Sequence, residues 1–377
     1  MRFDLHPRMM LLLLACLAAA PATQPARDVD VVVTKIETGP TSLTAAVKEA
    51  SPADLFFRLA QEAKVGIVPS DEGVWDDPSL QGALFTAEWE NQPLWEAVAE
   101  ACEATGLKAS IDTPQSGLPR IRLERGPARA AAIVDGAVMI RPLRIVRSAS
   151  VSHHDNQQEE DQVQLSLAVL LEPKLRNHAS VGRVRLEAAQ DENGKTLPPA
   201  QGGGSSNEPY GQPAVALLRY PPGAGKTLAL VRGAIPLQVV KEVATVTFRD
   251  PFSQPREMSA KVGPHTLTLR PVTGDAQSGW RVSLQLRRGE KPGDPLRDAQ
   301  WDATARPLGS FKGYVAMIGP AGETLMSGGS AGFGGEESHC ELHFAPRGDA
   351  PTELRIELPA AFESMEAKFE FKDLPLP

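Results

Sequence analysis

The stretch SPADLFFRLAQEAKVGIVP, residues 51–69, decides the fold of the first part of the chain, because it combines a capped helix with a short strand. Ser51 is a favoured N-cap residue, Pro52 suits the first helical position, and Asp54 lies near the positive end of the helix dipole. Apolar residues recur on one helical face, at Leu55, Phe56, Leu59, Ala60 and Ala63. The run VGIVP then favours a short buried strand.

The alternation of strands and helices continues on both sides of this stretch. SLTAAVKEA before it and GALFTAEWE after it favour strands, and Pro93 begins a second helix that ends at Gly106. The inner face of this helix carries Leu94, Val98, Ala101 and Cys102. LKASID and PRIRLER predict a closing hairpin. We therefore expect a small βαββαββ module over residues 42–126.

This module resembles the short N-terminal domain shared by secretins and TonB-dependent transducers. The matching positions are core or turn positions: Leu55, Leu59, Gly66, Ile67, Leu94, Val98, Gly106 and Leu107. The resemblance covers about a fifth of the chain and implies a periplasmic module that docks partner proteins without chemistry of its own. The pore or receptor role of the family is not implied, because no long membrane-embedded β region follows.

From residue 127 onward the sequence is typical of strands joined by turns. DQVQLSLAVLLEP alternates between apolar and polar residues, and Asn193-Gly194 predicts a hairpin turn. Short strands at this spacing predict two immunoglobulin-like β-sandwiches, over residues 127–255 and 256–377. The expected fold class is therefore α+β: the small module followed by two all-β sandwich modules.

Residues 1–22 predict an export signal. Arg2 and Arg8 precede the apolar run MMLLLLACLAAA, and Ala20-Pro21-Ala22 offers a small-residue cleavage site. Residues 23–41 then read as a linker. Cys16 follows Leu-Leu-Ala, so a lipoprotein signal with a lipidated Cys16 is an alternative. We expect an exported protein of the periplasm or cell envelope, which meets a membrane only through such a lipid anchor.

Charge and cysteine content narrow the function classes. The net charge of −8 and the lack of a Lys/Arg run argue against nucleic-acid binding. Apart from Cys16, only Cys102 and Cys340 remain, which is too few for a disulfide framework. Cys102 is expected to be a small buried apolar residue, although a Cys102–Cys340 bridge stays open.

The run YPPGAGKT, residues 220–227, contains part of a phosphate-binding loop. The first glycine of that motif is replaced by Tyr220, and Pro221 and Pro222 lack the N–H groups that would hold phosphates. The residues that follow Thr227 read as a strand, whereas the motif requires a helix. We therefore expect a turn between two strands and no bound nucleotide.

Three further patterns suggest chemistry. Gly328, Ser330 and Gly332 match the G-x-S-x-G of serine hydrolases, but no helix is predicted after them. His339, Glu341 and His343 alternate, so on a strand they share one face and suit zinc, yet a fourth ligand is not evident. An exposed polar face is favoured for these three, and a solvated turn for His153-His154-Asp155. A hydrolase using Ser330 and a metal-binding envelope protein remain alternatives, and no cofactor is expected.

The first module carries most of the net charge, with seven basic against fourteen acidic residues between Leu43 and Gly126. Its loop SDEGVWDDPSL places Trp75 among four carboxylates, those of Asp71, Glu72, Asp76 and Asp77. An exposed aromatic in an acidic loop suits a partner-docking site, whereas a Trp75 folded back on the sheet is the alternative. The expected function is a non-catalytic interaction or scaffold role with an envelope protein as partner.

Overall fold

The protein is predominantly β, as expected, with two α-helices among the residues that the structure describes. This computed structural model describes residues 28–112, 119–126, 132–151, 159–178, 180–181, 184–200, 214–263, 265–287, 315–325, 328–334, 337–344 and 350–377. The predicted export signal, Cys16 and the predicted turn at residues 153–155 lie outside these ranges. No helix in the described ranges is long and apolar enough to cross a membrane.

The first module is built around two helices. Its elements are β2 (Ser42–Ala50), α1 (Pro52–Ala63), β3 (Ile67–Pro69), the 3₁₀ turn η1 (Glu72–Val74), β4 (Phe85–Pro93), α2 (Leu94–Thr105), β5 (Leu107–Asp112) and β6 (Arg120–Arg125). The helix ends follow local chemistry, because the Ser51 side chain accepts from the N–H of Asp54 and Gly106 takes a left-handed φ of 67° after α2. Strands β2 and β4 form one small sheet, and β3, β6 and β5 form another.

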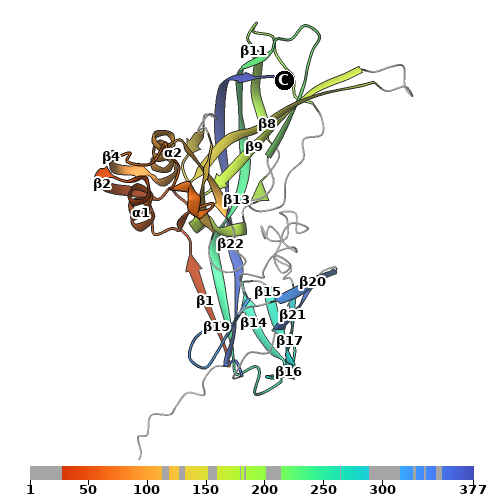
Figure 1. The fold of residues 1–377 in the computed structure, drawn as a ribbon. Helices are drawn as coiled ribbons and strands as arrows, with labels where there is room; N and C mark the ends of the chain where they lie inside the picture. Colours follow the sequence, from red (N-terminus) through yellow and green to blue (C-terminus); the bar gives the residue numbers. More distant parts are fainter. Residues whose placement is uncertain are drawn as a thin grey trace, which may run out of the picture.

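The other strands form three larger sheets (Figure 1). In the first half of the chain they are β1 (Val29–Lys35), β7 (Ile133–Asp135), β8 (Val138–Val151), β9 (Glu159–Leu171), β10 (Ser180–Val181), β11 (Arg185–Asp191), β12 (Ala214–Arg219) and β13 (Thr227–Arg249), with the 3₁₀ segment η2 (Pro173–His178). In the second half they are β14 (Met258–Val262), β15 (His265–Leu269), β16 (Thr273–Asp275), β17 (Gly279–Arg287), β18 (Val315–Ile318), β19 (Thr324–Leu325), β20 (Gly328–Gly334), β21 (Glu337–Phe344) and β22 (Glu353–Pro375).

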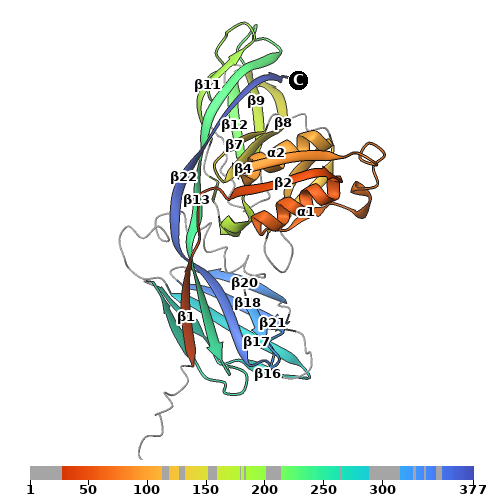
Figure 2. The same ribbon diagram turned by 90° about the vertical axis from the view of Figure 1, so that its left-hand side faces the viewer.

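The long sheet has the order β1-β13-β22-β18-β19, with β10 and β11 also paired to β13. Its strands β13 and β22 are antiparallel partners along nearly their whole length and run from one end of the molecule to the other (Figures 1 and 2). The four-stranded sheet β12-β9-β8-β7 packs against one half of the long sheet. The six-stranded sheet, β14-β15-β17-β21-β20 with β16 beside β17, packs against the other half.

The two sandwich cores therefore share the strands β13 and β22. The first core, against the four-stranded sheet, includes Leu228 and Val231 from the beginning of β13 and Phe369 and Phe371 from the end of β22. The second core, against the six-stranded sheet, takes the opposite halves of the same two strands, including Phe248. Each sandwich core thus contains residues from both β13 and β22, which are far apart in the sequence.

This arrangement differs from the expected division at residues 255 and 256. Strand β22 lies in the range expected for the second sandwich, yet its last third completes the core of the first. The expected linker, residues 23–41, contains β1, which pairs with β13 from Val29 to Lys35. Strand alternation shows which residues are buried but not which sheet buries them, so the sharing was not visible in the sequence.

The first module is joined to the first sandwich by a continuous apolar contact. Successive residues of β8 and β9 point to opposite faces of the four-stranded sheet, and both faces are buried. Val138 and Ile140 enter the first sandwich core, whereas Met139, Ala168 and Leu170 pack into the core of the module. The module is therefore held against the sheet by a shared core, with its outer side facing solvent (Figure 2).

Candidate interaction site

Trp75 is partly buried and packs on the module core. Its ring lies near that of Phe56, with centroids 6.1 Å apart and planes inclined by 34°. The structure therefore shows the alternative in which Trp75 folds back on the module, and the exposed aromatic anchor expected from the sequence is absent at this position. Asp71, Glu72 and Asp76 of the same loop are exposed.

Asp77 stabilises its own loop by hydrogen bonds. Its Oδ1 accepts hydrogen bonds from the N–H and the hydroxyl of Ser79, at 2.9 and 2.6 Å. These bonds, with a smaller contribution from the charge of Arg125, lower the pKa of Asp77. The Arg125 Nε lies 3.7 Å from Asp77 Oδ2. Asp77 therefore closes the turn before β4 and is engaged within the module.

The negative charge of the module gathers on surfaces that the sequence did not single out. Most of the basic side chains are paired within the module, in the ion pairs Arg58–Glu62, Lys108–Glu124, Arg120–Asp112 and Arg125–Asp77. Exposed glutamates on the outer face of β4 and on α2 add to this charge: Glu88, Glu90, Glu96, Glu100 and Glu103. The module also exposes Phe57 and Leu84, by 62% and 64%. The exposed surface of the module thus carries both carboxylates and two large apolar side chains.

Glu172 is a fully buried carboxylate that joins the module to the sandwich. Its oxygens accept from the N–H of Thr41 at 3.0 and 3.1 Å and from the Thr41 hydroxyl at 2.6 Å. Lys174 Nζ lies 3.3 Å from the same carboxylate and also donates to the carbonyl of Gly39. The carbonyl of Thr41 in turn accepts from the N–H of Leu94 at the start of α2. This joint fixes the position of the module, and nothing local in LEPKL distinguishes Glu172 in the sequence.

Cys102 is a buried free thiol, as the helical pattern predicted. Burial raises its pKa to about 12, while the nearby charge of Arg141 lowers it to a smaller extent. The thiol is therefore protonated at neutral pH and unsuited to nucleophilic chemistry. The bridge to Cys340 that the sequence left open is not formed, because Cys102 lies in the module core and Cys340 belongs to β21.

The GAGKT run forms a turn between β12 and β13, and carboxylates of the β11 hairpin occupy its N–H groups. Asp191 Oδ2 accepts from the N–H of Gly225 at 2.7 Å. The Glu192 carboxylate accepts from the N–H groups of Lys226 and Thr227 at 2.7 and 2.8 Å. A Cβ on Gly225 would lie 2.2 Å from the Glu192 carboxylate. The donors that would hold a phosphate in a nucleotide-binding loop are thus bound to the protein itself.

These contacts predict an acid-sensitive turn. Burial raises the pKa of Asp191, but backbone N–H donors from Gly225, Lys195 and Asn193 together lower it below its ordinary value. Backbone N–H groups, including its own and those of Lys226 and Thr227, also lower the pKa of Glu192. Carboxylates with a lowered pKa in the folded state stabilise it above their unfolded pKa, and this contribution is lost as the pH falls through the folded value.

We therefore expect the melting temperature of the wild-type protein to fall more steeply between about pH 5 and about pH 3 than that of the double variant Asp191→Asn/Glu192→Gln. The variant should start from a lower melting temperature at neutral pH, because it lacks the two charges. Thermal unfolding followed by circular dichroism across the pH range checks this. Parallel curves would show that these two carboxylates do not contribute to the pH dependence of the melting temperature.

Ser330 lies inside a strand. β20 pairs antiparallel with β21, and Ser330 stands opposite Glu341 in the register. A nucleophile elbow requires a tight turn from a strand into a helix, whereas β20 is followed along the chain by another strand. The G-x-S-x-G pattern is therefore placed in a geometry that does not suit serine hydrolysis.

His339, Glu341 and His343 are exposed on one face of β21, while Leu342 and Phe344 are each buried to 2% exposure on the other. Within the described ranges, no group of three or more His, Cys, Asp or Glu side chains is arranged to hold a metal ion. The alternation of β21 thus follows the pattern of an exposed polar face on a sandwich sheet, which was the favoured interpretation.

Comparisons with family models, with curated proteins and with solved structures found no match to this chain. The resemblance of residues 42–126 to the short N-terminal domain of secretins and TonB-dependent transducers stays a prediction from the sequence. The functional argument therefore rests on the surfaces and joints described above.

Proposed function

We propose that this chain is an exported, envelope-associated protein with a non-catalytic interaction or scaffold role, and that its first module binds an envelope protein. The observation that carries the proposal is the exposed surface of this module, which carries carboxylates on β4 and α2 and the exposed Phe57 and Leu84. Interfaces commonly combine apolar anchors with charges that steer a partner of opposite sign. The partner is therefore a protein with a basic docking surface.

The way the module is mounted supports this role. Its core continues into the four-stranded sheet through Met139, Ala168 and Leu170, and Glu172 holds Thr41 at the joint. A surface on a module that is fixed rigidly in this way loses little conformational freedom when a partner binds. The long sheet then holds this surface at a fixed place relative to the second sandwich.

The finer assignments belong to the same proposal. Residues 42–126 form a domain of the secretin and TonB short N-terminal type, and the two sandwiches are immunoglobulin-like. Residues 1–22 direct export to the periplasm or cell envelope, with lipidation of Cys16 as the alternative anchor. The polar face on β21 and the placement of Ser330 give no support to the metal-binding and hydrolase alternatives.

Reversing two of the exposed charges tests the docking role. Glu88→Lys/Glu90→Lys changes the solvent face of β4 and is expected to weaken capture of the partner by about tenfold or more at physiological salt, because attraction becomes repulsion. The matched control is Glu187→Lys/Glu257→Lys, which makes the same change in net charge at exposed positions outside the module. Cross-linked capture from the native cell envelope, quantified by mass spectrometry, provides the measurement.

Equal capture by the wild-type protein and both variants would place the binding surface elsewhere. Point changes are preferable to removal of the module, since deletion would uncover Met139, Ala168 and Leu170 on the four-stranded sheet. Circular dichroism of both variants verifies that the fold is retained.

A further inference from the structure

Strand β1 forms one edge of the long sheet, and β14 of the six-stranded sheet lies near it. Among the described residues its strand partner is β13, and it stands at the end of the strand order. Three consecutive valines lie exposed on it, Val31 by 39%, Val32 by 60% and Val33 by 52%. Natural edge strands are usually protected by charge, proline or a covering segment, and an apolar edge is prone to pair with another strand. Figure 2 shows β1 at the margin of this sheet.

The hydrogen bonds at its two ends reveal which groups of β1 are free to pair. The N–H of Arg249 donates to the carbonyl of Asp28, and the N–H of Ile36 donates to the carbonyl of Lys241. In an antiparallel pair, residues alternate between bonding inward and pointing outward. Even-numbered residues of β1 therefore bond to β13. The N–H and C=O groups that face away from β13 are those of Val29, Val31, Val33 and Lys35.

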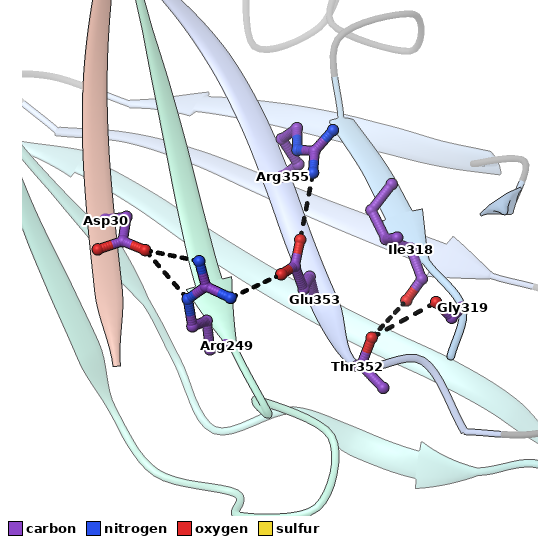
Figure 3. Close-up of polar contacts among 7 residues, drawn as sticks. All are labelled: Asp30, Arg249, Ile318, Gly319, Thr352, Glu353 and Arg355. Carbon is purple, nitrogen blue, oxygen red and sulfur yellow. Dashed lines mark hydrogen bonds and ion pairs between the residues drawn. The ribbon is translucent and has the colours of Figure 1, made fainter. Parts of the chain in front are cut away.

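Charge pairs link β1 to the two neighbouring strands of the long sheet. Arg249 on β13 donates to Asp30 on β1 at 3.0 and 2.8 Å, and its other terminal nitrogen donates to Glu353 on β22 at 3.0 Å. Glu353 also accepts from Arg355, so the network crosses three strands (Figure 3). The hydrogen bond to Asp30 raises the pKa of Arg249. The charge of Asp30 is thus balanced from within the sheet, which leaves Lys35 as the remaining charge along β1.

We propose that β1 pairs antiparallel with β1 of a second copy of this chain, in a register centred on Val32. In this register Val31 faces Val33 of the other copy, Asp30 faces Thr34, and Val29 faces Lys35. No like charges stand opposite each other, and all residues of Val29–Lys35 are paired. A shift by two residues in either direction leaves part of the strand without a partner.

Symmetry supports a second copy as the occupant. A two-fold axis perpendicular to the sheet keeps each face of the sheet on the same side, so odd residues meet odd residues across the new edge. The odd residues are those whose backbone groups point outward, which satisfies both strands reciprocally. The six exposed valines of the two strands become neighbours, and the long sheets of two copies become one continuous sheet.

A single cysteine tests the register on purified full-length protein. Val32 would face its own copy as a non-hydrogen-bonded pair, for which Cα atoms lie about 4.5 Å apart, within the range that a disulfide spans. Val32→Cys is therefore expected to form a covalent dimer on mild oxidation, seen on a non-reducing gel. Thr34→Cys is the matched control, because its equivalent in the second copy lies several residues away along the strand. The native cysteines are present in both variants.

A proline provides the second measurement. The N–H of Val33 points away from β13, so Val33→Pro removes a donor of the new edge without breaking the ladder to β13, as edge strands tolerate. In sedimentation velocity the wild-type chain is expected to behave as a dimer, and Val33→Pro as a folded monomer. A monomeric wild-type chain, or cross-linking of Thr34→Cys without that of Val32→Cys, would overturn the proposal. These tests use no other protein, so they are independent of the proposed envelope partner.

Discussion

Replacing Glu172 with alanine is expected to lower the free energy of unfolding by about 3 kcal/mol. The change leaves the N–H and hydroxyl of Thr41 without their acceptor in a partly buried site and removes the ion-pair partner of Lys174. Each buried donor that loses its acceptor costs about 1–3 kcal/mol, and the space of the lost side chain adds to this. Urea unfolding followed by circular dichroism measures the difference.

Two further variants test whether the loss in the free energy of unfolding arises from the buried contacts of Glu172. Glu187→Ala removes an exposed carboxylate from its ion pair with Arg232 and is expected to cost less than about 1 kcal/mol, because exposed pairs contribute little. Glu172→Gln preserves the size and one acceptor oxygen, so an intermediate loss is expected. Faster proteolysis within residues 36–41 should accompany the loss in Glu172→Ala, since the joint is then released. A cost equal to that of Glu187→Ala would show that the joint is unimportant.

Gly233→Ala is expected to destabilise the protein by about 3 kcal/mol. Gly233 lies in β13 with Leu186 of β11 on one side and Phe369 of β22 directly opposite on the other. A Cβ at this position would stand 2.4 Å from the carbonyl oxygen of Arg185 and 3.0 Å from the Phe369 ring. The first contact is with backbone, which cannot move without breaking the ladder between β11 and β13.

Gly39→Ala is the matched control, because a Cβ there meets nothing within 4 Å. It is expected to change the melting temperature little, whereas Gly233→Ala should lower it by several degrees, in line with the usual relation between free energy and melting temperature. Differential scanning calorimetry of both variants separates the outcomes. Equal melting temperatures would mean that β11 shifts away from β13 without cost.

The helices of the first module could be predicted because their limits depend on neighbours in the sequence. Ser51 and Asp54 are three residues apart and form the cap, and Gly106 supplies the left-handed residue that ends α2. Glu172 shows the opposite case. Its partner Thr41 lies 131 residues earlier, and a carboxylate between leucine and proline carries no local sign of burial.

The sharing of β13 and β22 was missed for a related reason. The alternation of buried residues changes phase in the middle of both strands, where the register between β13 and β22 shifts. A local pattern does not show that one half of each strand packs into the first core and the other half into the second. The exposed run Val31–Val33 lies in the range that was expected to be a linker after the polar lead TQPARDVD, although it forms part of β1. For Trp75 the sequence left two alternatives open, an exposed ring and a ring folded back on the module. The loop sequence could not identify its neighbour Phe56, which lies in another element of the chain.

The shared strands also set the order in which the protein can be assembled. Among the described residues β22 is the last strand in sequence order, and both sandwich cores need it, the first for Phe369 and Phe371 and the second for Leu354 and Ile356. During synthesis neither core can close until these residues have emerged from the ribosome. The nascent chain therefore has no closed sandwich core before β22 has been synthesised.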